Sequence, residues 1–206
     1  MSMREKSWFP ILYMFITTLL LSAVVIAFGS ITRQRVKDNE RIAFERAVLE
    51  ALAIDLSGRT SPSDIHKTYR ENITEPTKST AGALRYTKND SLIAYALPIG
   101  GPGFWAPIRG VIGIAADKQT ITGISFYDQN ETPGLGGEIV KPEFRDQFVG
   151  KRLANEGMPL EIRMVSTRLD ESSVHAITGA TQTSTRLNKF LNKRLAAWRD
   201  AMKEIE

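Results

Sequence analysis

The 206-residue sequence contains no cysteine and only two histidines. Without cysteine the chain cannot form disulfides, thiolate metal sites, iron–sulfur ligands or a thiol nucleophile. The spacing of the other polar residues suggests neither a catalytic triad nor a metal cluster, so we expect no catalytic residue and no metal site in this chain. Any redox chemistry must therefore come from a bound cofactor.

The charged residues form no block of one sign. The 27 Lys and Arg residues are interspersed with 23 Asp and Glu residues, which gives a formal net charge of +4. A chain that binds nucleic acid usually shows a basic patch or stripe. We therefore expect no nucleic-acid partner, and we attribute the basic excess to a charged surface and to the flanks of a membrane segment.

Charge is missing altogether from residues 8–31, a run of about 24 residues that is long enough to cross a bilayer. This run predicts one transmembrane helix in the lipid bilayer. A cleaved signal peptide is the alternative, but its apolar core is shorter and residues 28–31 match a cleavage site poorly. The short basic head most simply stays inside, which places the chain from residue 33 onward outside the cytoplasm. We assign residues 1–35 to the head and anchor.

Residues 36–82 are expected to form a stalk helix and a connecting segment. The stalk helix should run over residues 33–56, where apolar residues recur at the four-residue spacing of one helix face. These residues are Phe44, Val48, Leu52 and Leu56. The stretch 57–82 is rich in Gly, Pro, Ser and Thr, which predicts mostly connection with one short helical turn over 64–69. His66, in that turn, is expected to be a solvated surface residue.

Residues 83–206 show the pattern of a compact α+β domain, in which strands precede packed helices. Strands are expected over 91–97, 109–115, 121–127 and 160–165, with a turn at 117–118 and a loop over 166–177. A short helix is expected over 141–148. The last helix should begin near Thr183 and bury one apolar face. That face comprises Leu187, Phe190, Leu191, Leu195, Trp198 and Met202. The expected fold class of the chain is therefore α+β, with a transmembrane helix and a stalk helix ahead of this domain.

The first motif suited to a ligand is Thr178-Gly179-Ala180-Thr181-Gln182-Thr183-Ser184, at the start of the last helix. Gly179 and Ala180 let a ligand approach the backbone, while the free amides and the dipole of a helix start favour a phosphate. The alternative is an ordinary helix cap, since Ser and Thr are preferred capping residues. Thr183 is the residue that we expect to serve as that cap.

The second motif, Asn130-Glu131-Thr132-Pro133-Gly134-Leu135-Gly136-Gly137, follows a predicted strand. Its glycines and proline predict a tight loop that exposes its backbone. Such a loop can lay amides against a flat ring, with Leu135 as an apolar contact. A plain long turn is the alternative.

The third motif, Gly100-Gly101-Pro102-Gly103-Phe104-Trp105-Ala106-Pro107, brings aromatic residues out of a glycine-rich loop just before a strand. Trp105 could stack on a ligand there. An aromatic residue at a strand entry is more often part of the core, so the core position remains the alternative for Trp105.

In this order and spacing, four segments resemble the FMN-binding domain family, which includes the C subunit of the sodium-pumping NADH:quinone reductase and the G subunit of the Rnf complex. The segments are Gly103-Phe104-Trp105, Thr120-Ile121-Thr122-Gly123-Ile124, Glu131-Thr132-Pro133-Gly134-Leu135-Gly136 and Thr178-Gly179-Ala180-Thr181. The resemblance implies that a flavin transferase joins the phosphate of FMN to the Thr181 hydroxyl as a phosphoester. It also implies that the loop from Glu131 to Leu135 lies against the isoalloxazine ring. Cofactor contacts are thus expected from Trp105, Glu131, Thr132, Pro133, Gly134, Leu135, Thr178, Gly179, Ala180 and Thr181.

The resemblance further implies an electron-transfer subunit of a redox-driven ion pump in the bacterial inner membrane. Such a subunit would cross the membrane once, face the periplasmic or extracytoplasmic side, and have the other membrane subunits of the pump as partners. Residues 126–129 and 136–139 favour the C subunit, with the Rnf subunit as the alternative. A membrane-tethered binding or sensory domain without flavin is the alternative from another class.

One position departs from the family pattern. Members of the family usually carry an acid six residues before the flavin acceptor, and this chain has His175 there. Asp170 and Glu171 lie a little upstream and are candidates to replace that acid. His175 itself can be interpreted as a plain loop residue or as a functional one.

Overall fold

The computed structural model describes residues 8–59 and 61–205, and it divides into two compact units at residue 41. Helix α1 (Phe9–Ala51) contributes to both units. Within the first unit its apolar side chains are exposed, among them Val25 and Phe28, and none of its most apolar stretch is buried. By length and composition α1 can cross a membrane. A helix with this surface is compatible with the single-pass anchor that the sequence predicts.

The last turns of α1 pack inside the second unit, where Val48 and Leu49 are fully buried. The helix ends at Ala51 because Ala53 adopts a left-handed backbone with φ of 54°. The amide of Ile54 then bonds back to the carbonyl of Leu49 at 3.0 Å, which closes the helix end. The predicted stalk helix is therefore confirmed, but its continuation to residue 56 is wrong. Alanine stands at the left-handed position where helices usually place glycine.

Helix α2 (Pro62–Asn72) is longer than the single turn predicted over 64–69. Its first turn is capped by Ser61, whose Oγ accepts the amide of Asp64 at 3.2 Å, and Pro62 suits the first helical position. The chain then enters strand β1 (Ile73–Thr74) and the 3-10 turn η2 (Lys78–Thr80). The stretch 57–82 is thus more regular than the sequence predicts.

His66 on α2 is paired, so the prediction of a solvated surface histidine is wrong. Its Nδ1 lies 2.9 Å from Oε1 of Glu45, a carboxylate of α1 that is only 2% exposed. A buried carboxylate needs such a partner, because leaving it unpaired would cost several kcal/mol. The two residues are 21 positions apart, so only the packing of α2 on α1 brings them together.

A five-stranded antiparallel sheet follows, in the order β1-β2-β3-β4-β5. Its longer strands are β2 (Leu84–Lys88), β3 (Ser91–Pro102), β4 (Pro107–Ala115) and β5 (Ile121–Asp128). The three strands predicted between residues 91 and 127 are confirmed, and so is the turn at 117–118. Strand β3 runs further than predicted, because its last residues pair with β4 as far as Pro102 opposite Pro107. The first three residues of the third motif therefore belong to a strand and not to a loop.

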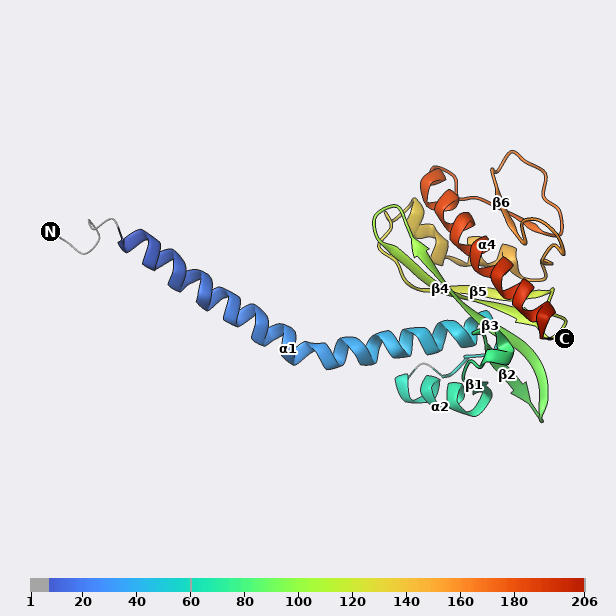
Figure 1. Cartoon of the computed structure of the whole chain (residues 1–206), viewed down its shortest axis with the longest axis horizontal. Helices are drawn as coiled ribbons and strands as arrows, with labels where there is room; N and C mark the ends of the chain where they lie inside the picture. Colours follow the sequence, from blue (N-terminus) through green and yellow to red (C-terminus); the bar gives the residue numbers. More distant parts are fainter. Residues whose placement is uncertain (1–7, 60, 206) are drawn as a thin grey trace. The chain divides into compact units, whose positions relative to one another are not determined.

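Both faces of the sheet are covered, which produces two apolar cores (Figure 1). Along β3, Leu97 points into the core beneath the last helix, whereas Ala96 belongs to the core formed with the end of α1. The core formed with the end of α1 is tightly packed, because a Cβ on Gly113 would collide with the carbonyl of Ala51. Thr122 donates its hydroxyl to the same carbonyl at 2.7 Å. Small residues in β4 and β5 thus let α1 end directly on the sheet.

The last helix, α4 (Thr181–Glu204), lies across the sheet face opposite α2 (Figure 1). All six residues of its predicted apolar face are buried. The helix begins two residues earlier than the predicted start at Thr183. Together with the sheet, α4 confirms the α+β fold class.

Short elements connect β5 to α4. They are η3 (Gly136–Val140), α3 (Pro142–Arg145), η4 (Asp146–Phe148), β6 (Glu161–Arg163) and β7 (Ser173–His175). The helix predicted over 141–148 is present as α3 and η4, and the strand predicted over 160–165 is present as β6. Strand β7 pairs with β6 in parallel inside the predicted loop 166–177, so that part of the loop prediction is wrong.

Candidate functional site

The three predicted ligand-binding motifs converge on one open pocket of about 300 Å³. It is lined by Phe104, Trp105, Glu131, Thr132, Leu135, Gly136, Gly179, Ala180, Thr181, Gln182 and Thr183. Strand pairing explains this convergence, because the end of β3, the start of β4 and the end of β5 meet at the same end of the sheet. The loops that leave this end meet the first turn of α4. We call this space the α4 pocket.

Seven of the ten predicted contact residues line the α4 pocket: Trp105, Glu131, Thr132, Leu135, Gly179, Ala180 and Thr181. Gly134 and Thr178 line a neighbouring pocket of about 460 Å³. Pro133 is exposed and lines neither of these two pockets. Four further lining residues were not predicted as contacts: Phe104, Gly136, Gln182 and Thr183. All four lie within or beside the three motifs, so the motifs themselves were the signal that could have found them.

Helix α4 starts at this pocket without a side-chain cap. Its N-cap residue is Ala180, and no side-chain hydrogen bond caps this helix start among the described residues. The first amides of a helix have no carbonyl partner within the helix, and their dipoles favour an anion. The first turn carries no acidic residue, and the side chains of Thr181 and Gln182 are exposed. The Thr181 hydroxyl is therefore accessible beside a set of amides suited to a phosphate.

Thr183 does not cap the helix, so that prediction is wrong. It lies inside the first turn of α4 and is only 4% exposed. Its hydroxyl donates a hydrogen bond of 2.6 Å to Oε2 of Glu131, on the opposite wall of the pocket. The cap assignment failed because the helix begins at Thr181 and because the side chain of Thr183 finds a tertiary partner.

Trp105 is 69% exposed, so the alternative that places it in the core is wrong. Its indole Nε1 donates to the hydroxyl of Thr132 at 3.1 Å, which orients the ring beside the pocket. The ring of Phe104 packs edge-on against it at 4.9 Å between centroids. An exposed aromatic face at the rim of a pocket is suited to stacking on a flat ring.

Arg186 brings a positive charge to the same rim. Its guanidinium carbon lies 5.9 Å from the centroid of the Phe104 ring, in a cation–π arrangement. Its Nε is buried and has no hydrogen-bond partner within residues 8–59 and 61–205. Sequence reasoning did not select Arg186. The one available signal is its position four residues after Gln182, which places the two residues on the same face of α4.

The loop between β5 and η3 is held by Glu138. Its Oε1 accepts the amide of Gly134 at 3.0 Å, and its Oε2 lies 2.6 Å from the ammonium of Lys141. Hydrogen bonding from Lys141 holds the pKa of the Glu138 carboxyl below its ordinary value. Gly134 itself has φ of 75°, a conformation that a side chain would strain.

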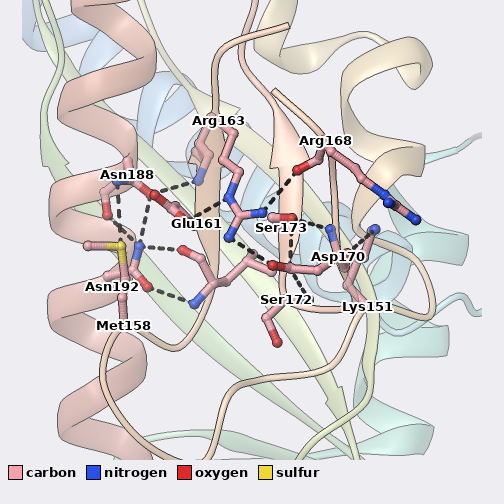
Figure 2. A network of polar contacts seen from close by, with 12 residues as sticks. Lys151, Met158, Glu161, Arg163, Arg168, Asp170, Ser172, Ser173, Asn188 and Asn192 are labelled. Atoms are coloured by element: carbon pink, nitrogen blue, oxygen red, sulfur yellow. Dashed lines mark hydrogen bonds and ion pairs between the residues drawn. The ribbon is translucent and has the colours of Figure 1, made fainter. Parts of the chain in front are cut away.

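Arg163 on β6 is the centre of a polar network (Figure 2). It contacts Glu161 at 2.7 Å, Asp170 at 2.8 Å and the carbonyl of Arg168 at 3.0 Å. The Ser173 hydroxyl donates to Asp170 and holds the pKa of that carboxyl below its ordinary value. Asp170 is therefore engaged within this network, whereas the side chain of Glu171 is exposed at the surface.

Two asparagines of α4 fasten the short β6–β7 sheet to the helix (Figure 2). The amide of Ile162 donates to Oδ1 of Asn188 at 2.9 Å, and the amide of Leu160 donates to Oδ1 of Asn192 at 2.9 Å. Side-chain bonds of this kind satisfy strand-edge amides that would otherwise lack partners. They fix β7, and with it the segment that leads into Thr181.

His175 is the last residue of β7, six positions before Thr181. Its backbone amide donates to Oε1 of Gln147 at 2.9 Å. Its side-chain Nδ1 is buried and has no hydrogen-bond partner among the residues that the structure describes.

Comparison with known proteins identifies the class of domain that the fold and the pocket form. Residues 103–196 match the FMN-binding domain family. These boundaries include all eleven residues that line the α4 pocket. The resemblance deduced from the motifs is thereby confirmed.

The particular relatives are C subunits of one enzyme, the Na(+)-translocating NADH-quinone reductase. The C subunit from Vibrio vulnificus is 38% identical over 111 residues, which cover 52% of this chain and 44% of that protein. The C subunit from Yersinia pestis is 41% identical over 99 residues, covering 47% of this chain and 37% of that protein. The chain thus spans less than half the length of the curated relatives that it matches.

Two solved structures share the fold. The C subunit of the Na(+)-translocating NADH-quinone reductase from Parabacteroides distasonis aligns with a TM-score of 0.71 at 24% identity, covering 82% of this chain and 96% of that one. The NqrC of Shewanella oneidensis aligns with a TM-score of 0.64 at 18% identity, covering 82% and 99%. These structures support the α+β architecture described above.

The residues of the α4 pocket fit FMN. An uncapped helix start offers amides to a phosphate, Thr181 offers an accessible hydroxyl next to them, and Trp105 offers a flat exposed ring. The residues therefore supply separate places for the two ends of this cofactor.

Proposed function

We propose that this chain is a membrane-anchored electron-transfer subunit of a redox-driven ion pump, similar to the C subunit of the Na(+)-translocating NADH-quinone reductase. In this proposal FMN is attached covalently, through a phosphoester, to Thr181. The observation that carries the proposal is the position of Thr181, whose exposed side chain stands at the uncapped start of α4 and lines the pocket. A flavin supplies the ability to take up and release electrons, and the protein sets its position and potential.

Each wall of the α4 pocket has a role in this proposal. The first amides of α4 stabilise the phosphate charge after attachment, since they lack partners within the helix. Trp105, oriented by its bond to Thr132, provides a face against which the ring can stack. Leu135, which is 43% exposed, adds an apolar contact on the loop side. A covalent bond keeps the cofactor on a domain that faces a compartment where free FMN is scarce.

The test is a pair of variants at Thr181. The full chain is co-expressed with a flavin transferase, and we expect it to fluoresce on a denaturing gel and to gain the mass of FMN less water. Thr181→Ala should lose both signals while remaining folded, because its side chain is exposed and does not cap the helix. Thr181→Ser keeps a hydroxyl at the same position and should retain some attachment. Flavin that remains covalently bound in Thr181→Ala would refute the acceptor assignment.

We further propose that α1 is an uncleaved anchor and that the domain lies on the periplasmic or extracytoplasmic side. The support is the exposed apolar surface of α1 and the short basic segment that precedes it. A reporter that is active only outside the cytoplasm, fused to the C-terminus, should give signal. Signal only from a cytoplasmic reporter would reverse the orientation.

The proposed partners are the other membrane subunits of the pump, the lipid bilayer, and a flavin transferase during maturation. The names of the relatives favour the sodium-pumping quinone reductase over the Rnf complex. Purification of the intact chain from native membranes should therefore recover subunits of an NADH-oxidising complex. Recovery of Rnf subunits in their place would assign the chain to the alternative complex.

A further inference from the structure

The carboxylate of Glu131 accepts three hydrogen bonds from residues around the α4 pocket. Its Oε1 accepts the backbone amides of Phe104 at 2.8 Å and Trp105 at 3.0 Å. Its Oε2 accepts the hydroxyl of Thr183 at 2.6 Å. One carboxylate therefore joins the β3–β4 loop, its own loop after β5, and the first turn of α4.

The burial of this carboxylate is costly unless its bonds are kept. Glu131 is only 5% exposed, and an ionised carboxylate at such a position needs hydrogen-bond donors around it. Three of its approximately four acceptor positions are occupied by the three donors. Bonds to an ionised acceptor are roughly twice as strong as neutral ones, so this arrangement resists loosening.

Two glycines leave space for this carboxylate. A Cβ on Gly103 would lie 2.5 Å from Oε1 of Glu131, and a Cβ on Gly136 would lie 2.8 Å from Oε2. Real Cβ atoms do not approach so closely, so both positions exclude larger residues while Glu131 keeps its place. This gives a physical reason for a glycine in each of two motifs that lie far apart in the sequence.

We propose that Glu131 is a positioning residue, which holds the three walls of the α4 pocket in register and leaves contact with the flavin to Trp105, Leu135 and Thr181. This inference rests on the proposed function, because the ligand of the pocket is taken to be FMN. Glu131 acts through the backbone at residues 104–105 and through Thr183. Its acceptor positions are occupied by internal bonds, so we propose that its contribution to the cofactor is geometric.

The first experiment measures hydrogen exchange of the full chain in detergent micelles, in the Thr181→Ala background that carries no flavin. In Glu131→Ala the amides of Phe104 and Trp105 lose their acceptor, and we expect them to exchange at least about tenfold faster. Glu131→Gln can keep the same three bonds, since its oxygen accepts from the amides and its NH₂ group donates to the Thr183 hydroxyl. It should therefore restore most of the protection.

Matched variants separate positioning from general stability. Thr183→Val removes only the bond to Oε2, whereas Thr183→Ser keeps it, so only the valine variant should loosen the start of α4. Ser125→Ala is the control outside the pocket, because Ser125 is 2% exposed and donates to another carboxylate, Glu50, at 2.8 Å. It should leave exchange at residues 104–105 unchanged. Faster exchange spread evenly over the domain in Glu131→Ala would overturn the positioning role.

The second experiment uses the flavin-loaded chain and records the absorbance band shape and midpoint potential of the flavin. Both should change in Glu131→Ala and stay near wild type in Ser125→Ala, while the covalent bond to Thr181 persists. A loaded Glu131→Ala chain with an unchanged spectrum and potential would refute the inference and leave the proposed function standing. A wild-type chain that takes up no flavin would refute the proposed function, and the exchange experiment would then decide the positioning role alone.

Discussion

Helices α2 and α4 begin in opposite ways, although a run of hydroxyl residues is present at both starts. At α2, Ser61 accepts the amide of Asp64, proline occupies the first position, and Asp64 adds a negative charge to the first turn. At α4 the cap position is held by Ala180, and the first turn has no acid. The start of α2 therefore has a side-chain cap and an acidic residue that favours its dipole, whereas the start of α4 has neither.

The hydroxyl groups themselves show the same difference. The Ser61 side chain is used locally, within the first turn of its own helix. The Thr183 side chain is used across the pocket, where it donates to Glu131, a residue 52 positions away. The start of α4 thus turns its buried hydroxyl toward the scaffold and leaves the exposed one, Thr181, facing the pocket.

The largest expected effect concerns the glycine packed against the start of α4. Gly136→Ala should lower the free energy of unfolding by about 3 kcal/mol. The new Cβ would lie 2.8 Å from Oε2 of Glu131 and closer still to the hydroxyl of Thr183. Gly58→Ala, three residues before the cap of α2, should lower the free energy of unfolding by only about 1 kcal/mol. The φ of 75° is strained for alanine, but no atom lies within 4 Å of the new Cβ. Urea unfolding of the detergent-solubilised chain measures both. Equal losses would show that the start of α4 is not the more tightly packed of the two.

The next effect is the loss of the cap on α2. Ser61→Ala should lower the free energy of unfolding by about 1 kcal/mol, because the amide of Asp64 loses its acceptor. The flavin content of the loaded chain should stay unchanged, since Ser61 does not line the α4 pocket. Ser61→Gly should cost only a few tenths of a kcal/mol and serves as the control. A parallel loss of flavin would mean that the two helix starts are not independent.

A smaller effect follows from giving α4 the acidic first turn that α2 has. Gln182→Glu should stabilise the helix by about 0.3–1 kcal/mol through the dipole. The same charge should oppose the incoming phosphate and slow flavin attachment roughly two- to fivefold, which is the rate equivalent of that energy. Gln182→Lys should change both quantities in the opposite direction, and added salt should reduce both effects. Attachment rates measured by in-gel fluorescence that do not differ between the two variants would exclude a phosphate near Gln182.

The smallest expected effect is on how pH changes the hydrogen-exchange protection of the loop between β5 and η3. Because the folded pKa of Glu138 is lowered by Lys141, its contribution to stability is present above the ordinary carboxyl pKa and is lost as the pH falls through the lowered folded value. The protection factor of the Gly134 amide, which is its exchange rate corrected for the intrinsic effect of pH, should therefore fall at acidic pH, since this amide donates to the same carboxylate. Glu138→Gln should abolish that pH dependence. An acid-induced loss of protection that persists in the glutamine variant would have to arise from another group.

The sequence alone determined the elements whose residues follow a strong period. The apolar run of α1, the alternating strands β3 to β5 and the buried face of α4 are local patterns, so composition and spacing specify them. It also indicated the three motifs as candidate ligand sites, but each had an ordinary structural alternative, and their meeting in one pocket is a finding of the structure. The chemistry expected at Thr181 follows from these motifs and from the family resemblance.

Only the tertiary structure decided the features that depend on partners far along the chain. The helix α1 ends at Ala51 because a left-handed alanine lets it stop against β4 and β5, and no residue pattern marks that end. Strand β7 forms because β6 supplies its pairing partner. The side chain of Thr183, predicted as a helix cap, forms one buried bond with Glu131 across the pocket. Such a bond is favourable only after folding has excluded water from both groups, so no local sequence rule can anticipate it.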